Sequence, residues 1–224
     1  MRPGSSGSTP YSLSACRPSS RLVLRRHARS QPTGGEQFNK GKRRGVVQFA
    51  PDGVTGFDYS MSTNLMDKPI RTLSIGPYTY QSGGAIAEAL PKGMKWLRLP
   101  SKPGARSPFF TPVFILEPAT LKAVLSTTSG TAAGVRKGAI TLGALFKVSP
   151  AYRAANFKAL SAKTAAVKVS WKLWTAKNGL PTRLVTAWTD DGALGPSKKT
   201  SDIRFTSWGT RSTLAAPPAA QTAS

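Results

Sequence analysis

The stretch VKVSWKLWTAKNGLPTRLVTAWTDDG, residues 167–192, decides the fold class. Apolar and polar residues alternate from Val167 to Leu173, and this period of two residues is typical of a half-buried strand. Asn178-Gly179 is the strongest short hairpin signal, and Pro181 indicates a connection longer than two residues. Residues 183–189 then form the return strand. The stretch therefore predicts an antiparallel hairpin with Trp171 in the core and lysines on the other face.

The rest of the chain repeats this pattern of short strands and turn signals. We expect strands at residues 46–50, 54–60, 70–80 with a bend at Gly76-Pro77, 94–99, 109–116, 139–148 and 203–208. Short helices are expected at 85–90 and 151–163, the second after the cap Ser149-Pro150. The tally of eight to ten short strands predicts an all-β fold, an antiparallel jelly-roll-type sandwich over residues 46–211 with one or two inserted helices.

The charge is strongly one-sided. The 224 residues include 32 Lys and Arg against 9 Asp and Glu, for a net charge of +23. The 72 residues between Glu117 and Asp190 contain eleven bases and no acid. Soluble surfaces usually mix both signs, so this distribution predicts a strong positive potential and a phosphate-bearing partner. The alternative is a basic protein that its charge merely keeps soluble.

The two ends of the chain have the composition of disordered segments. Residues 1–45 carry ten bases and one acid among many Ser, Gly and Pro, which predicts a disordered basic arm. Residues 212–224 are mostly Ala, Pro, Ser and Thr, and we expect a disordered tail. Residues 1–30 also fit an organellar transit peptide, with eight Ser, six Arg and no acid. The cluster KGKRRG, residues 40–45, is a weak nuclear-localisation signal.

Several kinds of chemistry are not expected. A single Cys and a single His leave no disulfide framework, zinc cluster or Ser-His-Asp triad. No phosphate-binding loop, transmembrane run, metal site or cofactor site is found, so an enzyme is not expected. Asp190-Asp191 caps a hairpin or, alternatively, joins a neighbouring subunit's carboxylate in a weak divalent-cation site. Trp174, on the lysine side, could stack on a base, cover a subunit interface or lie at a sheet edge.

A basic arm, a β-rich domain and a short polar tail together resemble the coat protein of a small plant RNA virus, most closely an ourmiavirus coat protein. The resemblance implies a jelly-roll shell of many identical copies, a virion in the host cytoplasm or nucleus, and packaged RNA. It assigns neutralisation of the phosphates to the bases of the arm: Arg17, Arg21, Arg25, Arg26, Arg29, Lys40, Lys42, Arg43 and Arg44. Lys168 and Lys172 of the domain extend this nucleic-acid-binding set.

Two alternatives stay open at this point. Charge alone does not separate RNA from single-stranded DNA, although RNA is the expected form. The second functional class is an organellar RNA-binding or ribosomal protein whose first 30 or so residues are removed on import.

Overall fold

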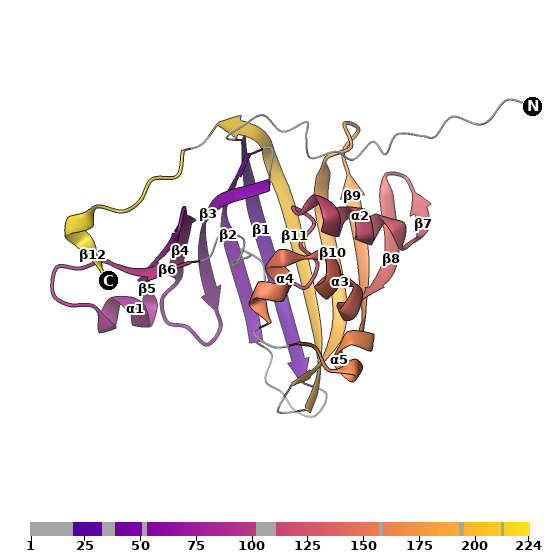
Figure 1. Cartoon of the computed structure of the whole chain (residues 1–224), viewed down its shortest axis with the longest axis horizontal. Coiled ribbons are helices and arrows are strands. Elements are labelled where there is room, and N and C mark those ends of the chain that lie inside the picture. Colours follow the sequence, from indigo (N-terminus) through magenta and orange to yellow (C-terminus); the bar gives the residue numbers. More distant parts are fainter. Residues whose placement is uncertain are drawn as a thin grey trace, which may run out of the picture.

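The protein is built around one curved sheet of 12 strands (Figure 1). The computed structural model describes residues 20–32, 39–50, 53–101, 111–156, 159–192, 195–211 and 213–224. The strand order is β12-β6-β5-β4-β3-β2-β1-β11-β10-β9-β8-β7, and all neighbours are antiparallel except β12 and β6. Most neighbours in space are also neighbours in sequence. The sheet therefore consists of two meanders, β1 to β6 and β7 to β11, which the pairing of β11 with β1 joins into one open sheet.

Strands make up most of the described chain. They are β1 (Ser20–Pro32), β2 (Asn39–Ala50), β3 (Gly53–Thr63), β4 (Ile70–Ile75), β5 (Tyr78–Gly83), β6 (Trp96–Pro100), β7 (Thr128–Ala132), β8 (Val135–Thr141), β9 (Lys168–Thr175), β10 (Pro181–Gly192), β11 (Gly195–Arg211) and β12 (Thr222–Ala223). The helices are α1 (Gly84–Ala89), α2 (Pro118–Ser126), α3 (Leu142–Val148), α4 (Pro150–Ala155), α5 (Ala162–Ala166) and the 3₁₀ turn η2 (Ala219–Gln221). No helix in the described ranges is long and apolar enough to span a membrane.

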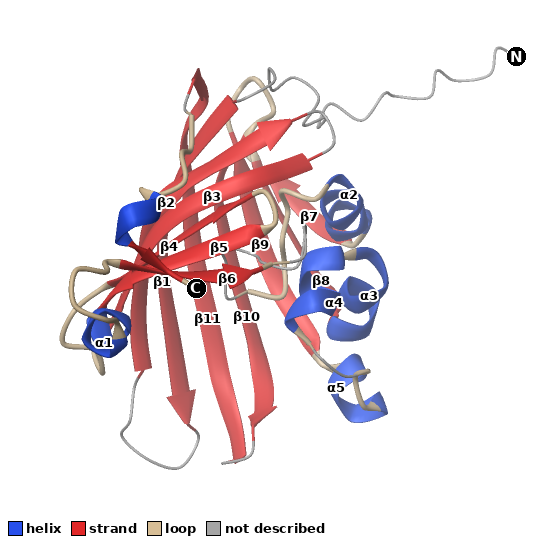
Figure 2. Cartoon of the chain, turned by 60° about the vertical axis from the view of Figure 1, so that its left-hand side comes forward, coloured by secondary structure: helices blue, strands red, loops and turns tan. Residues whose placement is uncertain are grey.

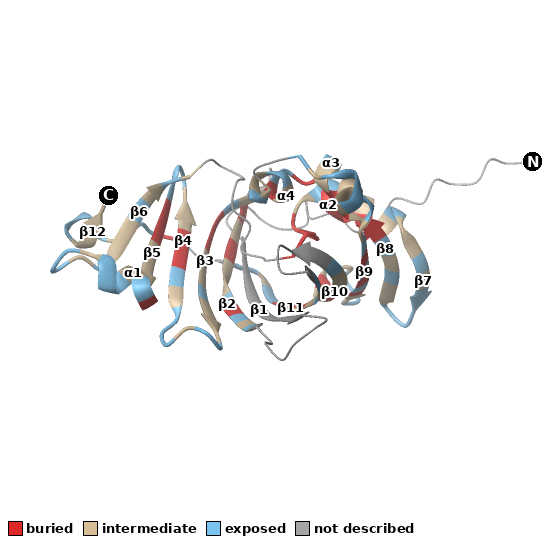
Figure 3. Cartoon of the chain, turned by 90° about the horizontal axis from the view of Figure 1, so that it is seen from below, coloured by how far each residue is buried: buried red, intermediate tan, exposed pale blue. Residues whose placement is uncertain are grey.

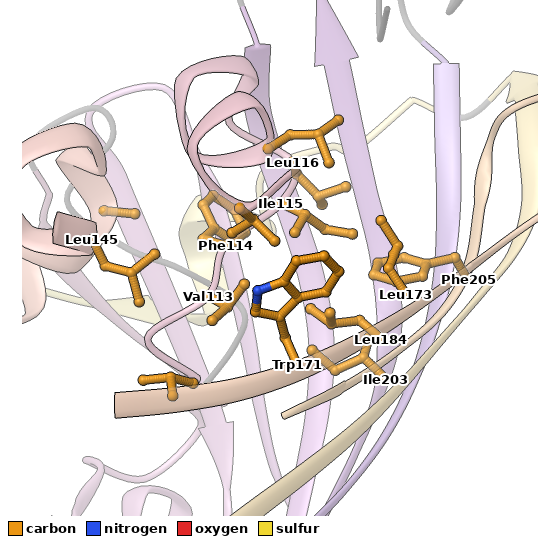
Figure 4. Close-up of a cluster of buried hydrophobic side chains, with 14 of the residues drawn as sticks. Val113, Phe114, Ile115, Leu116, Leu145, Trp171, Leu173, Leu184, Ile203 and Phe205 are labelled. Atoms are coloured by element: carbon orange, nitrogen blue, oxygen red, sulfur yellow. The ribbon is translucent and has the colours of Figure 1, made fainter. Parts of the chain in front are cut away.

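Helices α2 to α4 lie on one side of the sheet, which curves around them (Figures 2 and 3). The core fills the space between. The segment Val113–Leu116 is fully buried there, against Trp171 and Leu173 of β9 and against Ile203 of β11 (Figure 4). The Trp171 ring nitrogen Nε1 donates a hydrogen bond to Thr127 Oγ1 at 3.1 Å. Trp171 is thus a core residue, as its place in the alternating pattern predicts.

Glu117 joins α2 to α4 beside this core. Its carboxylate accepts hydrogen bonds from the hydroxyls of Thr120 and Ser149 and from the backbone N–H of Ala151. The hydroxyl of Ser149 in turn accepts from the N–H of Tyr152, which is the N-cap expected at Ser149-Pro150. The first-turn amides of α4 are satisfied in this way, so both helices are held over the sheet.

The central strands correct the predicted disordered arm. β1 pairs with β2 on one side and with β11 on the other, over almost its whole length. The expected boundary at residue 45 therefore falls inside β2 rather than between an arm and a domain. Composition misled here because the apolar residues of β1 are few and its arginines many, whereas backbone pairing in a sheet does not depend on side-chain type. Residues 1–19 lie outside the described residues.

The C-terminal segment is also ordered, contrary to the disordered tail expected from composition. Leu214 is buried against Leu73 and Tyr80, on the sheet face opposite the helices. The backbone then continues through η2 to β12, which pairs with Trp96 and Leu97 of β6. One buried leucine and a short edge pairing hold a segment that is otherwise Ala, Pro and Thr.

Two predicted strands differ in the structure. Residues 111–116 are buried but form an irregular segment with bends and a turn, instead of the strand expected at 109–116. The alternating run 139–148 is divided between the end of β8 and the helix α3, which Thr141 caps by accepting from Ala144 N–H. Leu142 and Leu145 are both buried, and their spacing of three also fits a helix, so the period of two was ambiguous. The helix expected at 151–163 is two short helices, α4 and α5.

The all-β class is confirmed at the level of a mostly antiparallel β-protein. The jelly-roll topology is not confirmed: a jelly roll packs two sheets joined by Greek-key connections, and the described strands form one open sheet of two meanders. Helices, not a second sheet, cover the inner face. The 167–192 hairpin is observed as predicted, as β9 and β10 around Asn178-Gly179.

Candidate polyanion-binding face

The sheet face opposite α2 to α5 is open to solvent over β2 and β8 to β11, and it is strongly basic. We call this surface the basic face. Its side chains alternate along each strand with those of the core, since successive residues point to opposite faces. The bases whose side chains the structure describes there are Lys40, Lys42, Arg44, Lys137, Lys168, Lys172, Arg183, Lys198 and Arg204. Asp202 is the one acid described among them in the paired rows.

The strand register aligns these residues in rows that run across the strands. The arginine row consists, from β9 to β4, of Trp174, Arg183, Arg204, Arg25, Arg44, Ser60 and Arg71. The adjacent lysine row consists, from β8 to β3, of Lys137, Lys172, Val185, Asp202, His27, Lys42 and Ser62. Neighbouring strands lie about 4.8 Å apart, so the arginine row spans about 29 Å.

Like charges face each other directly in these rows. Lys137 is paired with Lys172, and Arg183 with Arg204. Directly opposed like charges destabilise a sheet, by up to about 0.8 kcal/mol for unit charges 5 Å apart in water. A surface that only needed solubility would mix both signs. The arrangement is therefore one that a bound polyanion would relieve.

One arginine of the face is fixed in a defined orientation. Arg183 on β10 makes a bidentate pair with Asp202 on β11, with Nε–Oδ1 2.9 Å and Nη2–Oδ2 2.6 Å. Its guanidinium carbon lies 4.8 Å from the centroid of the Trp174 ring on β9. The hydrogen bonds that Arg183 donates to the Asp202 carboxylate raise the pKa of Arg183 above its already high usual value. The guanidinium stays charged, planar and partly exposed.

A second arginine on the same face has matching partners. Arg71 on β4 makes a bidentate pair with Asp58 on β3, with Nε–Oδ1 3.0 Å and Nη2–Oδ2 2.6 Å. Its guanidinium carbon lies 5.2 Å from the Trp96 ring centroid. Nearby, Arg98 lies 4.9 Å from the ring of Tyr78, which is exposed. Arginine–aromatic pairs therefore flank the bases of the open face at both ends.

The structure brings together five of the predicted binding residues and separates a sixth from them. Lys40, Lys42, Arg44, Lys168 and Lys172 are all exposed on the basic face. Arg43 is 7% exposed and points to the opposite side, with its guanidinium carbon 4.6 Å from the Tyr59 ring and Nη2 3.1 Å from Met61 Sδ. Burial lowers the pKa of Arg43. Its assignment as a phosphate-neutralising residue is wrong, because strand alternation turns it inward.

The remaining predicted residues lie at or beyond the limits of the described chain. Arg17 lies outside the described residues. Arg21, Arg25, Arg26 and Arg29 are backbone positions of β1, and their side chains are outside the described part. The same holds for the side chains of Asp190 and Asp191, whose backbone pairs with Pro196 and Ser197 near the end of the β10–β11 hairpin. Among the described residues, no three His, Cys, Asp or Glu side chains gather as metal ligands would.

Four bases of the face were not among the predicted binding residues: Lys137, Arg183, Lys198 and Arg204. A usable signal existed for two of them. From Lys198 to Phe205 the even positions are all polar, whereas the apolar residues Ile203 and Phe205 are at odd positions. This alternation is the period of a strand. The position of Lys137 opposite Lys172 depends on the pairing of β8 with β9, and no local pattern encodes that pairing.

Comparisons with known proteins were made for sequence and for structure. No protein-family model matches the chain, and no curated protein matches it. Among solved structures, it is similar to a LolA superfamily protein from Nitrosomonas europaea, with 9% identity, 90% of this chain and 91% of that chain covered, and a TM-score of 0.32. It is also similar to a DUF1329 family protein from Desulfovibrio piger, with 9% identity, 88% of each chain covered and a TM-score of 0.26.

The fold corrects the coat-protein interpretation, and the capsid function and the virion location expected from the sequence are not retained. Neither solved structure is described as a viral coat protein. The two features that carried the resemblance are also not as expected: the arm segment contains β1 and half of β2, and the sheet is built of two meanders. A cut near residue 30, as the organellar alternative expects, would take most of β1 out of the middle of the sheet.

Proposed function

We propose that the protein binds nucleic acid through the phosphates, using the basic face of its sheet. The observation that carries this proposal is the alignment of bases in register on one face. The exposed Lys137 lies opposite the exposed Lys172, and the exposed Arg204 lies opposite Arg183, whose charge is partly offset by Asp202. Folding alone gains nothing from such pairs, and phosphates placed between them would offset the repulsion. Backbone contacts of this kind carry no sequence information, so binding should be largely independent of base sequence.

Exposed bases away from the basic face provide a matched comparison. Lys122 on α2, Lys147 on α3 and Lys92 after α1 are also exposed, but none lies on the basic face. A partner attracted only by net charge would respond equally to both groups. A partner seated on the basic face would respond to one group only.

The test is the salt dependence of binding, measured by fluorescence anisotropy with a labelled oligouridylate of about 20 nucleotides. Each phosphate contact on a single strand contributes about 0.7 to the slope of log K against log salt, so nine engaged bases give a slope near −6. A triple variant on the basic face should reduce the magnitude of this slope by about 2. It combines Lys42→Gln, Lys137→Gln and Lys172→Gln. Lys92→Gln/Lys122→Gln/Lys147→Gln should leave the slope unchanged. Equal effects of both triple variants, or no binding at low salt, would refute the proposal.

Three further expectations stay predictions: self-association into large assemblies, the absence of enzymatic activity, and RNA rather than single-stranded DNA as the physiological ligand.

A further inference from the structure

The side of the sheet opposite α2 to α5 carries two Asp–Arg–Trp sets, one near each end of the arginine row. In each set an arginine makes a bidentate pair with an aspartate on the neighbouring strand. The same guanidinium lies over a tryptophan ring further out. The sets are Asp202–Arg183–Trp174 on β11, β10 and β9, and Asp58–Arg71–Trp96 on β3, β4 and β6.

The two sets are oriented in opposite directions along the sheet. In both, the aspartate lies toward the centre of the sheet and the tryptophan toward its edge. The exposed bases Arg204 and Arg44 lie between the two sets, in the same row as both arginines. A surface selected for charge alone does not require this symmetry, because an aspartate next to each arginine lowers the net charge.

The construction is suited to stacking. A bidentate carboxylate fixes the guanidinium plane, and the aromatic ring supports one side of it. The Arg71 side chain is 53% exposed and that of Arg183 is 36% exposed, so each offers a further surface to solvent. Nucleobases of single strands stack on arginine planes and on aromatic rings, whereas bases inside a duplex are already stacked on each other.

We infer that the ligand is a single strand that crosses the sheet along the arginine row, with its phosphates on the central bases and an unpaired base stacked at each Asp–Arg–Trp set. This inference rests on the proposed function and specifies its ligand. The flexible single strand follows the curved sheet, whereas a stiff duplex contacts a curved surface over a short length only.

Charge-conserving variants separate stacking from phosphate binding. Arg183→Lys and Arg71→Lys keep the positive charge but lose the planar group and the bidentate geometry. Their binding is compared for three labelled probes: an oligouridylate of about 20 nucleotides, an abasic oligonucleotide with the same number of phosphates, and a duplex RNA of the same length. Trp174→Phe retains an aromatic ring and serves as the conservative variant.

The expected result has three parts. The native protein binds the oligouridylate more tightly than either other probe. Arg183→Lys weakens oligouridylate binding about fivefold or more, the loss of one stacked base, and leaves abasic binding unchanged. Trp174→Phe retains most of the preference. Thermal unfolding of each variant shows whether the sheet is intact. If an Asp–Arg–Trp set only joins strands, its variants should lower the unfolding temperature without changing the preference for the oligouridylate over the abasic probe.

The outcomes distinguish the stacking inference from the proposed phosphate binding. Equal binding of base-bearing and abasic probes, or a duplex bound as tightly as the single strand, overturns the stacking inference and leaves the proposed function standing. No binding of any probe at low salt overturns both. If Arg183→Lys weakens the binding of the oligouridylate and of the abasic probe equally, Arg183 contacts phosphate and its stacking role is overturned.

Discussion

Arg43 and Arg44 are neighbours in sequence whose side chains lie on opposite sides of the sheet, because successive residues of a strand alternate. Arg43 lies inward over Tyr59, while Arg44 is exposed in the arginine row. From composition alone the two are equivalent, so both were predicted to bind phosphate. The phase of the alternation within β2 is set by Val47 and Phe49, which are buried on the same side as Arg43.

This pair gives a prediction at single-residue resolution. Arg44→Gln should reduce the salt slope of oligouridylate binding by about 0.7 and change the free energy of unfolding by less than about 0.5 kcal/mol. Arg43→Gln should leave the slope unchanged and destabilise the fold by about 1 to 3 kcal/mol, because a buried, hydrogen-bonded group loses its contacts. Anisotropy titrations and urea unfolding measure the two quantities. The reverse assignment of effects would show that the register of β2 is wrong.

Gly138 is required where β8 passes the core tryptophan. A Cβ at this position would lie 2.2 Å from the carbonyl oxygen of Thr127 and 2.6 Å from the Trp171 ring. Gly138→Ala should therefore destabilise the protein by about 2 to 3 kcal/mol, since neither neighbour is a flexible side-chain end. Gly41→Ala is the matched control, with its nearest atom 3.7 Å away, and should cost less than about 0.5 kcal/mol. Urea unfolding with similar values for both variants would contradict this packing.

At the scale of elements, sequence patterns identify a strand well where one of its faces is apolar and the other polar. The β9–β10 hairpin at Asn178-Gly179 was predicted because turn residues and alternation agree there. The interruption at Gly76-Pro77 was also predicted, although as a bend within one strand, whereas the structure has a turn between the paired strands β4 and β5. The β7–β8 hairpin and the helix α3 were not. The strand β7, with the sequence TSGTA, contains no large apolar residue that could show a period. The apolar residues of α3 fit two periods, and the choice between them depends on tertiary contacts with α2.

The strand β1 illustrates a different limit. Its segment reads as a basic arm because apolar content is low, yet it lies between β2 and β11 in the middle of the sheet. Pairing on both sides satisfies its backbone groups, and its neighbours supply the apolar core. Such a strand can be recognised only when its partners are known.

Truncation tests the position of β1. Deletion of residues 1–32 should abolish cooperative unfolding, because β2 and β11 would lose the strand that joins the two halves of the sheet. Deletion of residues 1–19 ends before β1 and should retain a cooperative transition. Circular dichroism during heating measures both. A cooperative transition of the shorter protein near the native temperature would show that β1 is dispensable, as an arm would be.

At the scale of the molecule, the two sides of the sheet have separate tasks. One side packs the helices and the core, and the other presents bases in register with few acids. The overall positive charge and its connection with a phosphate-bearing partner were evident from the sequence. The concentration of that charge on one face was not, since it depends on the register of β8 to β11 and on the pairing of β1 that brings the distant β2 into the same sheet.

Lysine footprinting tests the central claim most directly. The full-length protein is acetylated briefly with and without saturating oligouridylate, and each lysine is quantified by mass spectrometry. We predict protection of Lys42, Lys137, Lys168, Lys172 and Lys198 on the basic face, and unchanged modification of Lys92, Lys122 and Lys147 elsewhere. Protection centred on the helical side, or equal protection of both groups, would contradict a binding surface on the open face of the sheet.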